Sequence, residues 1–572
     1  SANHGAVVND FVTFSGAVSL GGNMTAAVLN QEYQITEIVD SSNYKIQARA
    51  AATTIQSITV DGQLVPSPVL ASAGDTGNGG TGVVASYQIN TGLTVAVSGT
   101  GWSAGTWGRS TWGSGVTTTV VNELRIYTQD NFGEDLIFNV RDGGIFYWDT
   151  SANTLGTSRA IPLTAVAGGT LWITGTTYAV GNTVYSPANY LSYESQTAFT
   201  STTDPSADAV NWVQISDLTT PTVAKQVLVS DRDRHVVVFG CDSETNPGVQ
   251  DPLLIRFSTQ ESVTTWTASA TNTAGDLRVG VGSEIVCAVE TTRQVLVFTD
   301  VSLHAMQFLG PPFTFGIDRL SENTTIAGPL AAKAVDDTVF WMGIEEFYVY
   351  TGQVQKLPCS VRSFVFNDFN LSQMELVTAS LNSSFSEIWW FYPSASSQEI
   401  DKYVVYNYQE KVWYYGSMVR TYWLDRGVND FPVAASTDGY LYNQEFGLND
   451  GSTTPPTAIT SYIESSQLSI GDGEDFVFLS RLIPDITFAA STSTAPTVNM
   501  TFQTRNAPGG QYLQSNVSGV TETATTPVEQ FTEQAFIRLR GRAFALKVDS
   551  STLDTQWRLG TTRVDVRPDG RR

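Results

Sequence analysis

Short apolar runs separated by polar turns recur along the chain, and the clearest example lies at residues 136–148. An apolar run at 136–140 is followed by Asp142-Gly143-Gly144 and then by an aromatic run at 145–148. Apolar and aromatic runs on either side of a glycine-containing turn are typical of a β-hairpin. Glycine accepts the positive φ that such turns need. The pattern therefore predicts two antiparallel strands joined by a tight turn.

The same plan of apolar strand, polar turn and aromatic strand returns five more times. These later units lie at 234–258, 283–300, 337–352, 386–408 and 431–446. Their starts are about 50 residues apart, which is within the span of propeller blades. Together with the first hairpin, they predict a β-propeller of about six blades.

Material before, within and after these repeats predicts further domains. Alternation of apolar and polar residues at 497–502 indicates an antiparallel β-sandwich at the end of the chain. The only helix that we expect is a short one around 371–376. The predicted fold is all-β, with a β-propeller-like body, inserted small β-domains and a C-terminal β-sandwich. The predicted domains are a small inserted β-module (1–57), the start of the propeller or a platform (58–167), a carbohydrate-module-like insertion (168–217), propeller blades (218–450) and the sandwich (451–572).

The insertion at 168–217 resembles the small chitin-binding type of carbohydrate module. The resemblance rests on its aromatic residues Trp172, Tyr178, Tyr190 and Trp212 and on a Gly-x-x-Val turn at 181–184. In that family exposed aromatic rings stack on sugar rings, so these four residues are candidates for glycan binding. The alternative is that Trp172, Tyr178 and Trp212 form the small core of the insertion, because a domain of this size needs its aromatic residues inside. We favour this alternative.

Charge is sparse and strongly acidic: charged residues make up 15% of the chain, and the formal net charge is −24. Binding of nucleic acid by counterion release needs clustered Lys and Arg. The acidity therefore indicates either plain solubility or a surface past which DNA moves without being held. Basic residues gather near the end of the chain, and five of them are candidates for partner or intersubunit contacts: Arg538, Arg540, Arg542, Arg563 and Arg567. Phosphate binding is the other possibility for this group, and we favour ion pairs with a partner.

The sequence contains few motifs that are typical of catalysis or of metal binding. The three histidines have no ligand-like partner at metal spacing, so we predict no metal, no cofactor and no enzymatic activity. Cys241, Cys287 and Cys359 form no close-spaced pair, which indicates buried thiols and synthesis in a reducing compartment. No apolar run approaches the roughly 20 residues of a membrane helix, so we expect no membrane contact.

Several longer motifs resemble tail nozzle proteins of short-tailed phages, which are also called packaged-DNA stabilisation or tail hub proteins. The C-terminal sequence DTQWRLGTTRVDVRPDGRR is similar to the ending of that family. The family is also matched by DNFGEDLIFNVRDGGIFYWD (130–149), WSAGTWG (102–108), DRHVVVFGC (233–241), TNTAGDLR (271–278) and NYQEKVWYYG (407–416). The match covers about residues 88–572, and the N-terminal module resembles a small β-module inserted in many phage tail proteins.

The resemblance implies a structural protein of the virion tail, made in the cytoplasm of the bacterial host. It implies a hexameric ring of this chain that closes the DNA channel below the portal and adaptor, retains the packaged genome and conducts it during ejection. The implied partners are further copies of the chain, the tail adaptor and portal-proximal proteins, and a tail fibre or a needle or plug protein. Phage DNA would pass through the lumen without sequence-specific binding. The alternatives are a receptor- or glycan-binding tail protein and, as a third, a propeller glycosidase.

Overall fold

The computed structural model is an almost entirely β structure, as the sequence pattern predicts. It describes residues 6, 10–40, 42–49, 57–60, 63–66, 68–88, 126–151, 160–310, 313–469, 473–507 and 522–571. The tryptophan-rich motif at 102–108 lies outside these residues. The chain divides into two compact units, the first formed by Ser1–Arg426 and Ala434–Tyr440 and the second by Gly427–Val433 and Leu441–Arg572. The predicted boundary between 450 and 451 therefore falls inside the second unit.

An N-terminal sheet opens the first unit in the strand order β3-β2-β1-β6. Its strands are β1 (Phe11–Ser15), β2 (Glu32–Asp40), β3 (Asn43–Ile46) and β6 (Val84–Gln88). A short helix, α1 (Ala26–Leu29), precedes β2, and β4 (Ser57–Val60) pairs with β5 (Gln63–Pro66). The predicted module boundary at residue 57 is wrong, because β6 returns to pair with the free edge of β1, with Val12 opposite Tyr87.

Five four-stranded antiparallel sheets follow, and each is built from one continuous stretch of the chain. The first contains β7 (Tyr127–Phe132), β8 (Asp135–Val140), β9 (Ile145–Trp148) and β10 (Ile161–Pro162). The second contains β16 (Gln226–Val229), β17 (Val236–Phe239), β20 (Leu254–Phe257) and β21 (Gly275–Arg278). The third contains β22 (Ile285–Glu290), β23 (Val295–Thr299), β24 (Ser302–Phe308) and β25 (Phe315–Glu322).

The fourth sheet contains β26 (Ala332–Val335), β27 (Thr338–Met342), β28 (Phe347–Tyr350) and β29 (Val354–Leu357). The fifth contains β30 (Thr378–Asn382), β31 (Glu387–Tyr392), β32 (Lys402–Asn407) and β33 (Val412–Ser417). A sixth sheet has three strands, β34 (Tyr422–Leu424), β35 (Val433–Ala435) and β36 (Leu441–Asn443). All six predicted hairpin units coincide with strands of these sheets.

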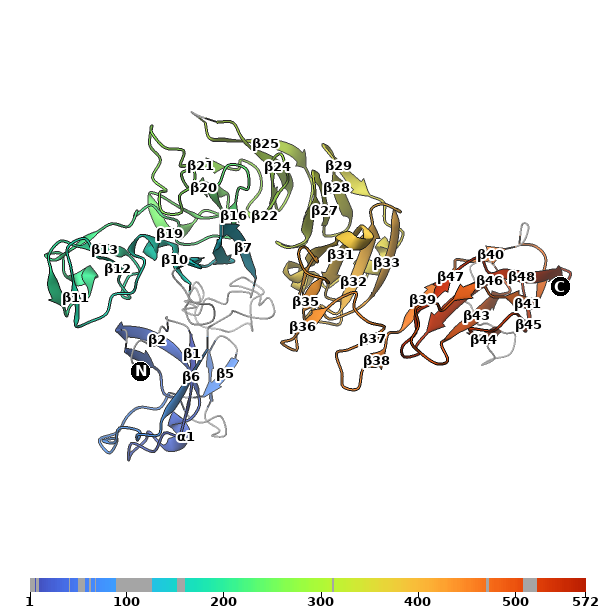
Figure 1. The fold of residues 1–572 in the computed structure, drawn as a ribbon, viewed down its shortest axis with the longest axis horizontal. Coiled ribbons are helices and arrows are strands. Elements are labelled where there is room, and N and C mark those ends of the chain that lie inside the picture. The colour runs from blue at the N-terminus through green and yellow to red at the C-terminus, as the bar shows by residue number, and fades with distance from the viewer. Residues whose placement is uncertain are drawn as a thin grey trace, which may run out of the picture. The chain divides into compact units, whose positions relative to one another are not determined.

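The first strands of successive sheets lie side by side, which gives the first unit its propeller-like arrangement (Figure 1). Such inner strands expose one backbone edge, and buried N–H and C=O groups need partners. Side chains of neighbouring sheets supply them. The Val227 N–H donates to Thr128 Oγ1 (3.1 Å), and the Gln226 amide makes two bonds of 2.7 Å with the backbone N–H and C=O of Ala288. The sixth sheet approaches the first where the Tyr422 and Gln129 side chains meet: burial raises the pKa of Tyr422, and the nearby Gln129 side chain acts against this rise.

The hairpin between β8 and β9 has the predicted strands but a different turn. The positive φ falls on Asp142 (58°) and not on either glycine. Gly143 instead forms a backbone bridge with Ala224, and a Cβ on Gly144 would lie 3.2 Å from the Phe146 ring. Close packing against Phe146 explains Gly144, whereas the aspartate takes up the left-handed conformation that Asp tolerates better than most residues.

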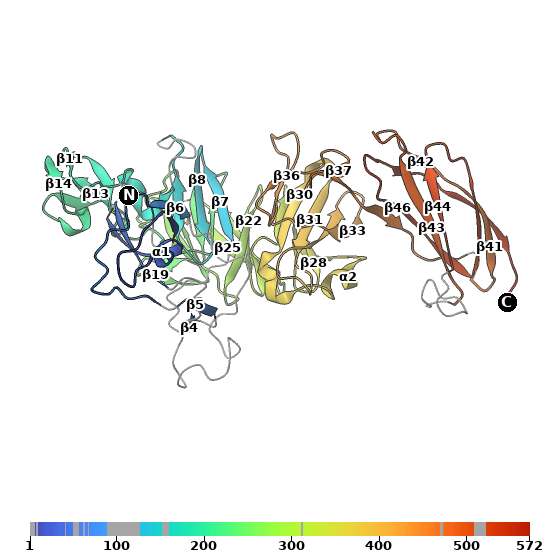
Figure 2. The same ribbon diagram turned by 90° about the horizontal axis from the view of Figure 1, so that it is seen from below.

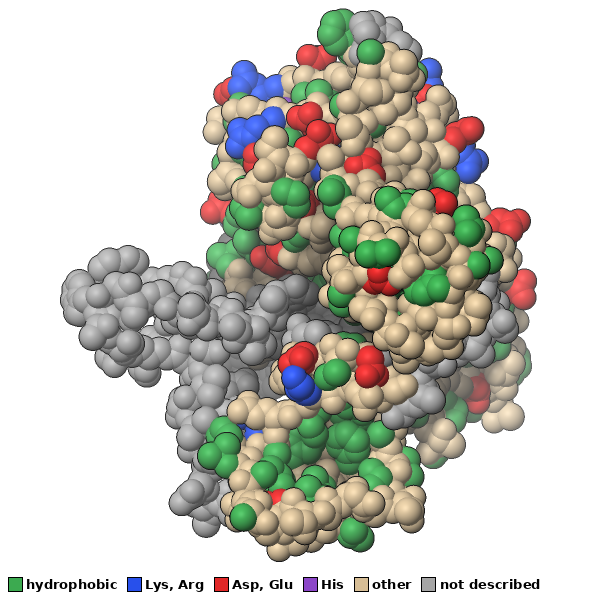
Figure 3. All heavy atoms as spheres, turned by 90° about the vertical axis from the view of Figure 1, so that its left-hand side faces the viewer, with side chains coloured by type: hydrophobic (Ala, Val, Ile, Leu, Met, Phe, Trp, Pro, Cys, Tyr) green, Lys and Arg blue, Asp and Glu red, His purple; other side chains and the backbone are tan. Residues whose placement is uncertain are grey.

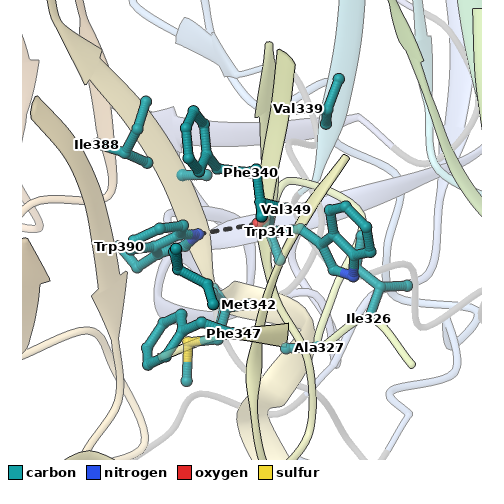
Figure 4. Close-up of a cluster of buried hydrophobic side chains, with 14 of the residues drawn as sticks. Ile326, Ala327, Val339, Phe340, Trp341, Met342, Phe347, Val349, Ile388 and Trp390 are labelled. Carbon is teal, nitrogen blue, oxygen red and sulfur yellow. Dashed lines mark hydrogen bonds between the residues drawn. The ribbon is translucent and has the colours of Figure 1, made fainter. Parts of the chain in front are cut away.

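The core between the fourth and fifth sheets is aromatic (Figure 4). Strand β31 is buried along its whole length, as its sequence predicts. Its Trp390 donates an indole hydrogen bond of 3.0 Å to the Ala331 carbonyl, and its ring centroid lies 4.9 Å from that of Phe347. Burial of the thiol is confirmed for Cys241 and Cys287, whereas Cys359 is half-buried.

Other elements are short. The predicted helix is found at Leu371–Leu376 as the 3-10 helix η3, next to the α-helix α2 (Arg362–Phe366). Further 3-10 turns are η1 (Leu163–Gly168), η2 (Pro205–Ala207) and η4 (Ser383–Phe385). Two short pairs complete the elements outside the insertion and the sandwich: β18 (Asp242–Ser243) with β19 (Asn246–Gln250), and β37 (Asn449–Asp450) with β38 (Thr457–Ala458).

The second unit contains a β-sandwich of two packed sheets (Figure 2). One sheet contains β39 (Ser461–Glu464), β40 (Leu468–Ser469), β43 (Thr497–Arg505), β44 (Thr523–Glu529) and β46 (Ala543–Ser550). The other has the order β45 (Ala535–Gly541), β41 (Val477–Ile483) and β48 (Arg563–Pro568), and a short pair joins β42 (Ile486–Thr487) to β47 (Arg558–Leu559). Buried and less buried residues alternate along β43 throughout, which confirms the pattern seen at 497–502.

Candidate functional site

The outer face of the sheet β45-β41-β48 gathers most of the predicted contact arginines. On β45, Ile537 and Leu539 point into the sandwich core, so that the residues between them point outward. The register places Phe478 opposite both Arg540 and Arg567, and Ile483 opposite Arg563. We call this surface the arginine face; its members are Phe478, Arg481, Ile483, Phe536, Arg538, Arg540, Arg563, Asp565 and Arg567.

Ion pairs occupy part of the arginine face. The Arg481 guanidinium lies 2.7 Å from the Asp565 carboxylate, and Arg540 pairs with Asp569. Exposed pairs of this kind contribute only about 0–1 kcal/mol to stability. Arg538, Arg563 and Arg567 are exposed, and among the described residues no ion pair within 4.0 Å involves these three. The face therefore presents charge that no described residue compensates within 4.0 Å.

Two arginines depart from the simple pattern. Arg542 lies beyond the end of β45, and its guanidinium packs 4.8 Å from the centroid of the Phe476 ring, which Arg540 also contacts at 4.0 Å. Arg542 therefore lies next to Arg540 at the edge of the face, outside its three strands. Arg481 does belong to the face, although the sequence analysis missed it. It is far from Arg538 in sequence, and only the pairing of β41 with both neighbouring strands brings it into place.

The insertion forms two small sheets. Its strands are β11 (Thr176–Tyr178), β12 (Thr183–Tyr185), β13 (Ser192–Ser195), β14 (Phe199–Ser201) and β15 (Trp212–Gln214). Trp172, Tyr178 and Trp212 fill the core between them, with exposed fractions of 4%, 8% and 3%. The Trp212 and Tyr178 rings meet edge to face at 5.0 Å, and the Trp172 indole donates to Ser201 Oγ at 3.0 Å.

This burial corrects the glycan-binding prediction for Trp172, Tyr178 and Trp212. Stacking on a sugar needs an exposed ring face, and these rings present none because they supply the core of the insertion. Tyr190 is different: it is half-buried, has a φ of 55° and lies outside the core cluster. For Tyr190 a glycan contact stays a prediction.

Carboxylates meet where the inner strands of the first three sheets end. The Asp130 carboxylate accepts from Val229 N–H (2.9 Å), and the Glu290 carboxylate accepts from Asp231 N–H (3.1 Å). Burial raises the pKa of Glu290 to about 7, and the nearby charges of Asp231, Asp130 and Asp233 act in the same direction. Burial also raises the pKa of Asp130. We call these four residues the acidic cluster.

A buried lysine lies where the same inner strands begin. The ammonium of Lys225 lies 3.0 Å from the Asp142 carboxylate of the first sheet and 2.8 Å from the Glu284 carboxylate next to the third. The lysine side chain is 8% exposed, against 45% and 43% for its partners. Burial alone would raise the pKa of Asp142, but Lys225 and Arg141 outweigh it and hold that pKa below its usual value. One cation thus joins three sheets.

The described residues offer little for catalysis. No group of three or more His, Cys, Asp or Glu side chains among them is placed to hold a metal ion. Ser302 Oγ lies 2.9 Å from His304 Nε2, but both side chains are buried inside the third sheet, out of reach of a substrate. Burial and the nearby Arg319 lower the pKa of His304. No helix in the described part of the chain is both long and apolar enough to cross a membrane.

Comparison with known proteins gave weak structural likenesses. No family model matches the chain, and no curated protein matches it. Among solved structures, it is similar to the AfRom2 CNH domain (TM-score 0.28, 10% identity, 59% of this chain and 86% of that one). It is also similar to the N-terminal domain of Nup159 (0.19, 9%, 56% and 88%) and to PorZ of the type-IX secretion system of Porphyromonas gingivalis (0.18, 9%, 60% and 41%). At these scores the likenesses carry no inference about what the chain binds, and they assign it to no family.

Proposed function

We propose that this chain is a structural protein of a short-tailed phage tail. Six copies of it would form the nozzle or hub ring that closes the DNA channel below portal and adaptor. The ring would retain the packaged genome and conduct it during ejection. One observation carries the proposal: four of the motifs that resemble the nozzle family fall on the strands of the propeller-like body. They cover β8 and β9, β17, and the turn from β32 to β33, and the fourth motif, TNTAGDLR, covers β21.

Charge supports the same function. The first unit carries 20 Lys and Arg against 40 Asp and Glu, a net charge of −20. On the face drawn in Figure 3, acidic side chains are scattered over the surface and basic ones occur at only a few places. A lumen with such walls would repel phosphates and let DNA move past without being held. A sugar-stacking function loses three of its four candidate rings, which leaves the receptor-binding alternative with less support.

Electron cryomicroscopy of the intact particle tests this proposal. We expect a ring of copies of this chain on the tail axis, with DNA or a plug in the lumen. Copies at the periphery of the tail, or trimers that project sideways, would contradict the nozzle function and favour receptor binding. The same reconstruction would show which acidic side chains face the DNA.

A further inference from the structure

The arginine face is unusual for this protein in both charge and shape. It carries five arginines on three strands, and one aromatic ring, Phe536, is 75% exposed among them. Arginine and aromatic residues are enriched in protein interfaces, whereas lysine is depleted, and the face contains no lysine. A guanidinium presents a planar set of donors that matches a carboxylate in two bonds. The surface is therefore suited to bind carboxylates and an apolar contact together.

The acidic residues on the arginine face favour a protein partner over a nucleic acid. Asp565 lies on the face beside Arg481, and Asp569 pairs with Arg540 at its edge. A phosphate backbone needs a continuous positive surface, because its affinity grows with the number of phosphates neutralised. A protein surface that carries both carboxylates and some basic groups can complement this mixed pattern. The exposed Phe536 also matches an apolar side chain better than a phosphate.

The chain itself supplies a surface of the opposite charge. Its first unit has a net charge of −20, whereas the second unit, with 11 Lys and Arg against 15 Asp and Glu, has −4. In an assembly of this chain, complementary charge directs the arginine face of one copy toward the acidic first unit of another copy.

We propose that the arginine face binds the acidic surface of the first unit of a second copy of this chain. The contact deepens the nozzle function and rests on it for the ring that the contact would join. Arg538, Arg563 and Arg567 make the intermolecular ion pairs, and Phe536 provides the apolar centre.

Self-association of the full chain tests the charge requirement. Sedimentation velocity would compare wild type with the triple variant Arg538→Glu, Arg563→Glu and Arg567→Glu, between about 50 and 500 mM NaCl, where the screening of exposed charges changes several-fold. We expect wild type to associate more weakly as salt rises, and the variant to associate at least tenfold more weakly at low salt. The matched control is Arg505→Glu, Lys547→Glu and Arg558→Glu, which makes the same change in net charge on the second unit but outside the arginine face.

Three outcomes of this experiment would overturn the proposal. Wild type could stay monomeric at every concentration and salt, the triple variant could associate like wild type, or the control could lose association to the same extent. Circular dichroism of both variants checks that they keep the all-β fold, so that loss of association reports on the surface.

A photo-crosslinker in place of Phe536 tests which surface the face meets. With a mixture of ¹⁵N-labelled and unlabelled chains, we expect crosslinks between copies that join position 536 to peptides of the first unit. Crosslinks confined to the second unit would refute the contact. Retardation of duplex DNA by wild type but not by the triple variant would assign the face to phosphates instead.

The two proposals fail in different ways. A ring on the tail axis with crosslinks elsewhere would refute the arginine contact and leave the nozzle function intact. Crosslinks to the first unit, in a chain that is found at the tail periphery, would support the arginine contact and refute the nozzle function.

Discussion

At the scale of single residues, Lys225 shows how one buried charge stabilises several sheets. Lys225→Met would leave Asp142 and Glu284 without their shared cation, although both carboxylates are partly exposed and can be hydrated. Removing one partner of a buried ion pair costs about 3–5 kcal/mol, and hydration of the two carboxylates reduces this to about 2–3 kcal/mol. Urea unfolding would measure the loss. Lys45→Met is the control: it breaks an exposed pair with Glu37 and should cost under about 0.5 kcal/mol. Equal losses in the two variants would contradict this account of Lys225.

Glu290 gives the molecule a pH dependence of defined sign. Its pKa is about 7 in the folded chain, against 4.5 for an ordinary glutamate. The folded state therefore binds the proton more tightly, and this contribution to stability is complete below pH 4.5 and is lost as pH rises through 7. Partial exposure limits the effect to about 1–2 kcal/mol. Glu290→Gln should match wild type near pH 5 and exceed it at pH 8 in the free energy of unfolding. A constant difference between the two proteins across this range would show that Glu290 does not titrate there.

At the scale of elements, the insertion depends on a core of very few side chains. Trp212→Ala removes a ring that is packed against Tyr178 and Phe199, and such truncations cost about 3–5 kcal/mol. We expect faster amide exchange in β11–β15, with exchange in β22–β29 unchanged. Tyr190→Ala is the control, because Tyr190 lies outside the core. Wild-type protection of Trp212→Ala would contradict the packing. Loss of glycan binding by this variant would not identify a contact, since the insertion would have unfolded.

The sequence predicted the positions of the strands better than it predicted which strands pair with each other. Local runs and alternation of apolar residues were enough to predict the strands β8, β9 and β31 and the outward face of β45. The pairing of β6 with β1 and of β41 with two strands depends on contacts between distant segments. No local pattern encodes those contacts. For this reason Arg481 was missed and the module boundary was placed too early.

At the scale of the whole molecule, spacing predicted the plan of the propeller-like body. The period of about 50 residues corresponds to one sheet per repeat, and six sheets are found where six hairpin units were expected. The clusters of charged side chains were harder to predict from the sequence. The acidic cluster joins Asp130, Asp231, Asp233 and Glu290 from different sheets, and Lys225 reaches a carboxylate on each side. These groups come together only when the sheets pack, so a search along the chain for close-spaced motifs could not find them.

The construction of each sheet from one continuous stretch of the chain has a mechanical consequence. In the described residues no strand is shared between the sixth sheet and the first, and the approach of the Tyr422 side chain to that of Gln129 links them. Tension applied to the two ends of the chain should break this link early and then release the sheets one at a time. Each repeat of about 50 residues would add about 17 nm of contour length. Optical tweezers should therefore record a staircase of similar steps. One cooperative rupture of the whole first unit would mean that the sheets hold each other more firmly than their separate strand sets suggest.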